Sequence, residues 1–381
     1  MPWKDKTVEE LRREFIGAAE GADANISALC REFGISRTTA YKWLRRGSGG
    51  ESLSDGSHVP LSVPGRTDAE TEQLILRTRI ENPGWGAAKI LRFLANKGYT
   101  GLPCVRTGNA ILKRGGLIEP AESLKHRAFV RFEREKCNQL WQADFKGEFP
   151  LLNGTKCFPL DILDDHSRFC IGIYPKTSTI GAKQSFESAF REYGLPDAIL
   201  SDNGVQFAGF KGGFTLLVRW LMDIDVLMLH GRVMHPQTQG KIERFHRSMK
   251  TELLSGNEFL DIEDAGRALN NWRRKYNEER PHEALSMNCP ADLYSRSKRE
   301  YTEKIRPYEY SGDYHLIKVN SWGYLRFDTL EVYIGQTFEN TRLEVRPMED
   351  DKFAVCYRNF RIGLIDARER TLVSRVIQRL P

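Results

Sequence analysis

Three acidic residues, Asp144, Asp202 and Glu243, stand where the chain could bring their carboxylates to one point. The alternation of apolar and polar residues predicts that Asp144 lies on a strand, that Asp202 follows another strand, and that Glu243 lies near the start of a helix. Carboxylate oxygens suit Mg²⁺ and Mn²⁺, and two such ions about 3.5 to 4 Å apart can support an in-line displacement at phosphorus. The three residues are therefore candidate metal ligands and candidate catalytic residues.

The segments around these residues alternate between strand and helix patterns. Three strands come first, a helix follows, and strands and helices then alternate. The expected strands span 140–145, 158–164, 168–174, 198–201 and 225–229, and the expected helices span 181–193 and 241–247. An α/β layout of this kind can place Asp144 and Asp202 on neighbouring strands, with the Glu243 helix packed beside both.

Residues beside the two aspartates are expected to support the site. Asn203 and Gly204 allow the backbone to turn sharply after Asp202. Trp141 lies three residues before Asp144, and its large ring is expected to anchor the first strand in the core. These residues would act by orienting the carboxylates.

The helix that carries Glu243 also carries basic residues. Arg247 and Lys250 lie one and two helical turns after Glu243 on the same face, where they could bind nucleic-acid phosphates. Lys241, at the start of this helix, is a further candidate for binding DNA.

Other polar residues near the site have a functional and a structural interpretation. His235 and His246 could relay protons or contact substrate, although a lone histidine is more often a packing or hydrogen-bonding residue. Asp161, Asp164 and Asp165 cluster in the hairpin and could be taken for metal ligands. We expect these three to be structural, because paired turn carboxylates usually cap the backbone.

The first 47 residues have the outline of a helix-turn-helix DNA-binding domain. Capping and turn residues predict three short helices, the third over 37–46, with Thr7, Asn25 and Ser36 as their caps. In the third helix, Ala40, Tyr41 and Leu44 are expected to pack inward. The polar faces would carry five candidate DNA-reading residues, Arg37, Thr38, Thr39, Lys42 and Arg45. A helical protein-contact module is the alternative.

Residues 48–66 concentrate Gly, Ser and Pro without apolar periodicity, which predicts a flexible linker. A second helix-turn-helix domain is expected over 67–120, with Thr67 as the cap of its first helix and Arg106 as a further DNA-binding candidate. A merely structural role for either helical domain stays open. A basic connector over 121–136 leads into the α/β core.

From residue 313 onward the pattern changes to short alternating runs. Six strands are expected, over 316–319, 324–327, 330–334, 341–345, 353–357 and 361–365. Strands of this number can close into an SH3-like barrel, which removes exposed edges. The chain is therefore expected to combine all-α modules, an α/β core over 137–298 and a small all-β barrel over 313–381.

Composition narrows the class of protein without identifying a partner. The 381 residues are 40% hydrophobic and 28% charged, as in folded globular proteins, and the net charge of +6 suits a polyanionic partner. The seven cysteines include no C-x-x-C pair, so neither a disulfide framework nor a zinc finger is indicated. We found no signal-peptide pattern and no membrane-length apolar run, which favours a reducing, cytosolic compartment.

Five motifs together resemble one known family, the insertion-sequence transposases with a retroviral-integrase-type core. They are W-Q-A-D-F at 141–145, L-D-D-H-S-R-F at 163–169, S-D-N-G-V-Q-F at 201–207, H-P-Q-T-Q-G-K-I-E-R-F-H-R-S-M-K at 235–250 and Y-N-E-E-R-P-H-E-A-L at 276–285. The resemblance spans roughly 68–295. It implies a ribonuclease-H-like core, and it matches the family's three metal ligands to Asp144, Asp202 and Glu243.

The resemblance also implies partners and a location. The expected cofactor is a pair of Mg²⁺ or Mn²⁺ ions, and the expected partner is double-stranded DNA, both the terminal inverted repeats of the element and the target. The expected reaction is strand cleavage at the element's ends and transfer of the 3′-OH into target DNA. Assembly on two ends requires at least a homodimer, in the cytoplasm and nucleoid of a bacterium, with no membrane involved.

This sequence departs from retroviral integrases in two places. The stretch between Asp202 and Glu243 is longer, and no His-His-Cys-Cys zinc module precedes the core. Two other functions stay open: a ribonuclease-H-like nuclease without strand transfer, which would use the same metals, and a catalytically silent DNA-binding repressor.

Overall fold

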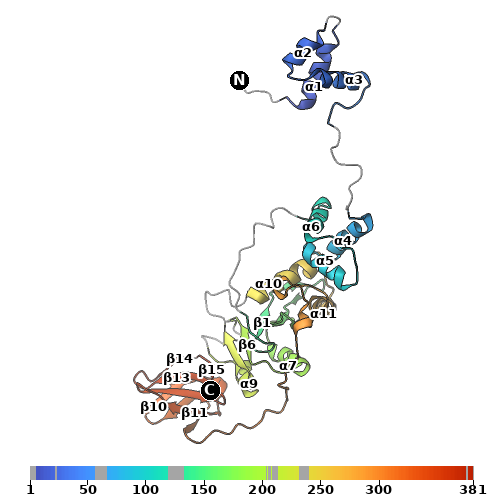
Figure 1. Cartoon of the computed structure of the whole chain (residues 1–381). Coiled ribbons are helices and arrows are strands. Elements are labelled where there is room, and N and C mark those ends of the chain that lie inside the picture. The colour runs from blue at the N-terminus through green and yellow to red at the C-terminus, as the bar shows by residue number, and fades with distance from the viewer. Residues whose placement is uncertain are drawn as a thin grey trace. The chain divides into compact units, whose positions relative to one another are not determined.

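A computed structural model describes residues 6–21, 24–55, 67–118, 133–202, 204, 207, 213–230, 240–374 and 376–380. The chain divides into two compact units, Met1–Arg66 and Thr67–Pro381 (Figure 1). The first unit is helical. The second contains a helical triplet, a mixed α/β core and an all-β domain.

The first unit contains the three helices that the sequence predicts. They are α1 (Val8–Ala19), α2 (Ile26–Glu32) and α3 (Arg37–Ser48). Thr7 and Glu10 form the reciprocal capping box of α1, and the side chains of Asn25 and Ser36 cap α2 and α3. Local capping chemistry is therefore sufficient to set where these helices begin.

The inward face of α3 differs from the prediction at one aromatic residue. Ala40 is buried as expected, but Tyr41 is 58% exposed and Trp43 is buried in its place. The guanidinium of Arg12 lies 3.8 Å from the centroid of the Trp43 ring, a cation–π contact that covers the indole. Tyr41 is therefore on the outer face of α3.

A second helical triplet opens the second unit. Its helices are α4 (Ala69–Glu81), α5 (Ala87–Asn96) and α6 (Val105–Arg114). Asp68, not Thr67, caps α4, because its carboxylate accepts the Thr71 N–H at 2.7 Å. The triplet has a small core of its own that includes Ile75, Trp85, Ile90 and Ile111.

The α/β core is built on a five-stranded mixed sheet in the order β5-β4-β1-β6-β7. The strands are β1 (Trp141–Phe145), β4 (Leu160–Asp164), β5 (Cys170–Tyr174), β6 (Ala198–Ser201) and β7 (Leu227–His230). β4 is antiparallel to β1 and β5, whereas β1, β6 and β7 run parallel. This is the ribonuclease-H-like arrangement, with a small hairpin, β2 (Phe149–Pro150) and β3 (Lys156–Cys157), inserted after β1.

Helices cover both faces of this sheet. The helices are α7 (Ala182–Tyr193), α9 (Leu216–Asp223), α10 (Gly240–Met249) and α11 (Ile262–Glu278), followed by a short α12 (Pro290–Leu293). Phe186 and Phe190 of α7 pack with Trp141 of β1. Phe245 of α10 and Leu269 of α11 pack with other strand residues, in a separate cluster. Successive residues of β4 thus face different helices, with Ile162 in the α7 cluster and Leu163 in the cluster of α10 and α11.

The C-terminal domain is all-β, as the sequence predicts. Its strands are β8 (His315–Lys318), β9 (Tyr324–Phe327), β10 (Leu330–Tyr333), β11 (Arg342–Pro347), β12 (Lys352–Tyr357), β13 (Phe360–Asp366), β14 (Thr371–Ser374) and β15 (Gln378–Arg379). They form a six-stranded sheet and a two-stranded hairpin. The sequence analysis did not predict the last two strands.

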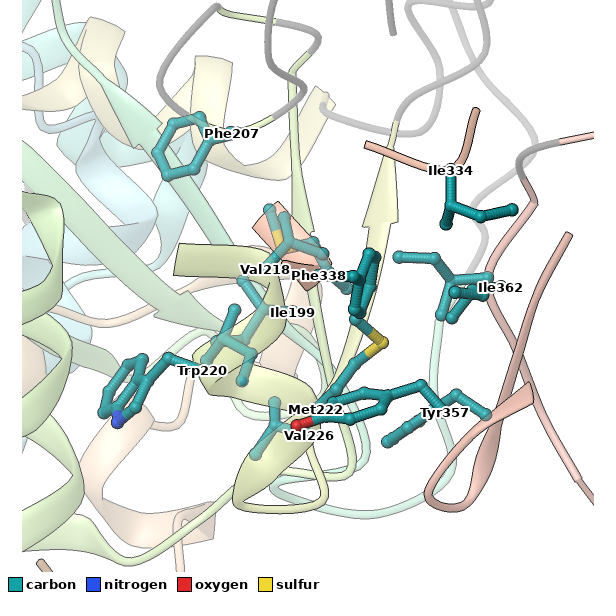
Figure 2. Close-up of a cluster of buried hydrophobic side chains, with 14 of the residues drawn as sticks. Ile199, Phe207, Val218, Trp220, Met222, Val226, Ile334, Phe338, Tyr357 and Ile362 are labelled. Atoms are coloured by element: carbon teal, nitrogen blue, oxygen red, sulfur yellow. The ribbon is translucent and has the colours of Figure 1, made fainter. Parts of the chain in front are cut away.

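The C-terminal domain and the α/β core share one apolar cluster (Figure 2). Phe338 and Tyr357 of the C-terminal domain meet Met222 and Val226 of the core, and all four side chains are at most 5% exposed. Phe338 also packs edge-to-face against Phe214 with ring centroids 5.3 Å apart. The two domains are therefore joined by a continuous core.

Carboxylates of the α9–β7 turn border this junction. Asp223 accepts from Arg358 at 3.0 Å, and Asp225 accepts from Arg379 at 2.7 Å. Arg219 donates to the Thr337 carbonyl at 2.6 Å. These contacts orient the C-terminal domain on the core, while the apolar contacts supply most of the attraction.

We expect Phe338→Ala to lower the free energy of unfolding by about 3 to 5 kcal/mol, because it leaves a cavity in the shared cluster. The measurement is urea unfolding followed by circular dichroism. Trp322→Ala is the control, because Trp322 is 72% exposed in the same domain and should cost less than about 0.5 kcal/mol. Equal midpoints for the two variants would mean that the junction contributes nothing to stability.

Candidate active site

Asp144 lies on the central strand of the sheet, opposite another aspartate. The antiparallel register of β1 and β4 pairs Asp144 with Asp161. Directly opposite residues on neighbouring strands point to the same face. Gln142, two residues before Asp144, accepts the Ile242 N–H of α10 at 3.3 Å, which identifies this face as the α10 side.

Asp202 immediately follows β6, the strand that runs parallel to β1 on its other side. Its carboxylate accepts the Gly204 N–H at 3.0 Å, which closes a tight turn after the strand. His230, at the end of β7, lies with Nδ1 3.5 Å from the Asp202 carbonyl oxygen. Sequence analysis missed His230, although the parallel register of Ser201 with His230 follows from the two strands.

The side chains of Asp144 and Asp202 are close enough for their charges to interact. Burial raises the pKa of Asp144 to about 6, and the negative charges of Asp202 and Asp161 add to the shift, against the opposing effect of His246. An arrangement that holds like charges together at a partly buried point is typical of functional sites. A divalent cation between the two carboxylates would offset the repulsion.

Glu243 lies in the first turn of α10, whose buried side packs Ile242, Phe245 and Met249 into the core. The Glu243 side chain itself is exposed. Within the part of the chain that the structure describes, no three or more Asp, Glu, His or Cys side chains are grouped closely enough to hold a metal ion. The donor set suits Mg²⁺ or Mn²⁺, but its third member stands apart from the two aspartates.

The basic residues of the α10 region differ in exposure. Lys241 forms an ion pair with Asp165, with Nζ 2.6 Å from Oδ2 and the lysine side chain 14% exposed. Its ammonium therefore holds the start of α10 to the sheet, and we assign it a structural role instead of phosphate binding. Arg247 and Lys250 are both exposed.

The hairpin aspartates also divide. Asp164 accepts from the Asn138 N–H and from Ser167, and Asp165 accepts from the Gln142 amide at 2.8 Å. The structural role predicted for these two is confirmed. Asp161 is just as buried but differs, because neither of its carboxylate oxygens has a well-formed hydrogen bond among the described residues.

The remaining predicted residues fall in several places. Trp141 is fully buried, and its Nε1 donates to Asn138 Oδ1 at 3.0 Å. Gly204 is in the turn after Asp202. Asn203 and His235 lie outside the described residues. His246 lies one turn after Glu243, with Nε2 2.8 Å from Asp161 Oδ2 and Nδ1 4.0 Å from Asp144 Oδ2.

The outer face of α3 contains the predicted DNA-reading residues. Arg37, Thr38, Lys42 and Arg45 are exposed, and Thr39 is half-buried because its hydroxyl contacts the capping residue Ser36. The guanidinium of Arg37 donates to the Ser27 hydroxyl of α2. Tyr41 lies among these side chains, a candidate contact residue that the sequence analysis placed in the core. In the second triplet, Arg106 is exposed in the first turn of α6.

The segment after α11 supports the α10 region from behind. Arg280 pairs with Glu252 at 2.8 Å, and both side chains are less than 10% exposed. Glu252 belongs to η4 (Lys250–Leu254), a π-helical turn that continues α10. Glu283 of this segment lies with Oε1 3.5 Å from Nζ of Lys89, which belongs to the second helical triplet.

Three family matches cover the first helical domain and the α/β core. Residues 134–236 and residues 225–290 each match a family described as "Integrase core domain", and residues 11–58 match a family described as "Helix-turn-helix domain". Among the helices of the described ranges, none is long and apolar enough to span a membrane.

Proteins of two insertion elements are among the relatives. The chain is 26% identical over 182 residues to an uncharacterized protein of insertion element IS407 from Burkholderia multivorans, covering 46% of this chain and 64% of the relative. It is 24% identical over 173 residues to an uncharacterized protein of insertion element IS476 from Xanthomonas euvesicatoria, covering 45% of this chain and 48% of the relative. The alignments thus span less than two thirds of either relative.

A solved structure with a similar core is the integrase catalytic core domain of HTLV-2 in complex with magnesium. It is 17% identical, with a TM-score of 0.32, covering 42% of this chain and 97% of that one.

His282, in the segment behind α10, yields a pH prediction. Burial, reinforced by Arg280 and Lys89, lowers the pKa of His282 well below its usual value. The unfolded chain takes up a proton near pH 6.5 whereas the folded chain does not, so stability is lost as pH falls below about 6.5. We expect His282→Gln to show a smaller drop in melting temperature between pH 7.5 and 5.5 than the wild type.

The control is His315→Gln, since His315 is exposed on β8. It should lose as much stability on acidification as the wild type. If His282→Gln lost as much as His315→Gln, the buried imidazole would not be the source of the acid sensitivity.

Proposed function

We propose that this chain cuts DNA at the ends of its element and joins the freed 3′-OH to target DNA. The chain belongs to the insertion-sequence transposases of the DDE type with an integrase-type core. The observation that carries the proposal is the approach of Asp144 and Asp202, on adjacent parallel strands, beside the helix that carries Glu243. Such a group of carboxylates suits metal-dependent phosphoryl transfer.

Asp144, Asp202 and Glu243 are the proposed ligands of two Mg²⁺ or Mn²⁺ ions. When bound, two such ions activate the attacking oxygen and stabilise the leaving oxygen. Because Glu243 is exposed on α10, its side chain is free to turn toward the aspartates when ions and DNA bind. Arg247 and Lys250, exposed beyond it, would hold DNA phosphates next to the carboxylates.

The helical domains are the proposed readers of the terminal repeats, through the outer face of α3 and through Arg106 of α6. The C-terminal domain, which we propose to be an SH3-like barrel, would contribute DNA or subunit contacts. Two element ends require at least two copies of the chain, and we propose that these assemble on DNA in the bacterial nucleoid. The proposed domains are 1–47, 67–120, 137–298 and 313–381, with connecting segments between them.

The proposal is tested by joining of a labelled duplex that carries the element's own terminal repeat into a plasmid. We expect the wild type to join in Mg²⁺ or Mn²⁺ and not in EDTA, and Glu243→Gln to fall to background while still binding the duplex. Joining by Glu243→Gln at the wild-type rate would remove Glu243 from the site. Cleavage without joining by the wild type would favour a nuclease, and repeat binding without cleavage would favour a repressor.

Recognition by α3 has a separate test. We expect Tyr41→Ala to weaken binding to the terminal repeat by about tenfold while leaving binding to unrelated DNA almost unchanged, as a base contact would. Arg45→Ala should weaken both and reduce the slope of log affinity against log salt by about 1. The measurement is fluorescence anisotropy at several salt concentrations.

Arg13→Ala is the matched control, because it removes the same charge from an exposed position on α1, where Arg13 pairs with Glu9. If Arg13→Ala and Arg45→Ala had the same effect, the charge of the domain, not the face of α3, would account for binding.

A further inference from the structure

Asp161 is a buried carboxylate that the proposed chemistry does not use. It is 0% exposed on β4, and neither of its oxygens has a hydrogen bond of good geometry within the described ranges. Asp164 of the same strand has its partners in Ser167 and the Asn138 backbone. A buried carboxylate without such partners costs several kcal/mol, so its presence needs a cause other than stability.

An ionisable partner of Asp161 comes from the helix of the proposed third ligand. His246 Nε2 lies 2.8 Å from Asp161 Oδ2. The other ring nitrogen of His246 lies 4.0 Å from Asp144 Oδ2. The imidazole therefore stands between the two aspartates that the β1–β4 register places opposite each other.

Helical spacing links this contact to Glu243. Residues three apart on a helix are neighbours on its surface, so His246 and Glu243 share one side of α10. Ile242, Phe245 and Met249 supply the apolar contact of α10, but apolar contact is non-directional and fixes the rotation of a helix loosely. The 2.8 Å approach of His246 to Asp161 instead fixes one point of the helix surface against β4 and so selects one rotation.

The start of α10 has a tether as well. Lys241 pairs with Asp165, and the Ile242 N–H donates to Gln142. These contacts hold the first residues of α10 on the same side of the sheet. The His246 contact acts one turn beyond Glu243, so Glu243 lies between two polar attachments to β1 and β4.

We infer that Asp161 and His246 are a positioning pair, which sets the rotation of α10 so that Glu243 can reach the metal ions held by Asp144 and Asp202. This inference rests on the proposed function. Neither residue is assigned to the ions or to the reacting atoms. Groups that orient metal ligands without binding the metal typically change metal affinity or activity by about 10 to 100-fold when removed.

The decisive variant is Asp161→Asn, which keeps the shape of the side chain and removes the buried charge. The amide carries no charge to bury, so the melting temperature should stay equal to the wild type or rise. We expect kcat for joining to fall about tenfold, with an unchanged KM for DNA and a higher Mn²⁺ concentration at half-maximal rate.

His246→Leu breaks the pair from the other side. It leaves Asp161 alone and buried, so it should lower the melting temperature in addition to the same kinetic change. His246→Gln, which keeps a donor on α10, should recover part of kcat. Mn²⁺ binding to the full chain, measured by calorimetry without DNA, should weaken in Asp161→Asn and provides a readout independent of activity.

Asp164→Asn is the control, because it alters a buried carboxylate of the same strand that is bonded to the backbone. It should lower the melting temperature without changing the Mn²⁺ requirement. A wild-type Mn²⁺ requirement and kcat in Asp161→Asn would overturn the inference while leaving the proposed function intact. A wild type without metal-dependent cleavage would instead remove the proposed function.

Discussion

Close approach of negative charges at one point of a packed sheet is the constraint around which the second unit is built. Asp144, Asp161 and Asp202 interact through their charges, and burial disfavours ionisation of Asp144 and Asp161. Such an arrangement persists only where many surrounding contacts hold it in place. Two sets of contacts hold it. One is the backbone pairing of β1 with β4, and the other is the packing of Trp141 against Phe190, with ring centroids 5.8 Å apart.

The helix α10 illustrates how this constraint shapes its neighbours. Lys241 binds Asp165 at its start, His246 meets Asp161 one turn beyond Glu243, and Arg280 donates to Ser248 near its end at 3.1 Å. Basic side chains of α10 thus contact aspartates of the sheet, and Arg280 holds the end of this helix from the segment behind it. The packed aromatic residues of α10 and α11, including Phe245 and Trp272 with centroids 5.3 Å apart, exclude water from this region. Lower water access strengthens each of these polar contacts.

Much of the fold was accessible from local patterns. The capping residues Thr7, Asn25 and Ser36 start the helices where predicted, because capping is a local interaction between a side chain and the next N–H groups. Strand β6 has the predicted bounds, because a short apolar run before a D-N-G turn is typical of a buried strand. The capping residue of α4 was missed because Thr67 and Asp68 are both good caps, and only the observed backbone separates them. Tyr41 was predicted to pack inward, but Trp43 is the buried aromatic residue of α3. Both are large aromatic residues, and only the packed helices, with Arg12 over the indole, show which of them is buried.

The sequence by itself determined the family, the helical and sheet-forming regions, and the order of the acidic residues along the chain, because these depend on residue types and short spacings. Only the tertiary structure decided which charges meet. Asp161 was indistinguishable from Asp164 and Asp165 in the sequence. The β1–β4 register sets it opposite Asp144, and α10 brings to it His246, which is 85 positions away along the chain. Lys241 was likewise predicted to bind DNA, and no pattern in the sequence indicated its ion pair with Asp165. Contacts between residues far apart in sequence depend on register and packing, which no local pattern encodes.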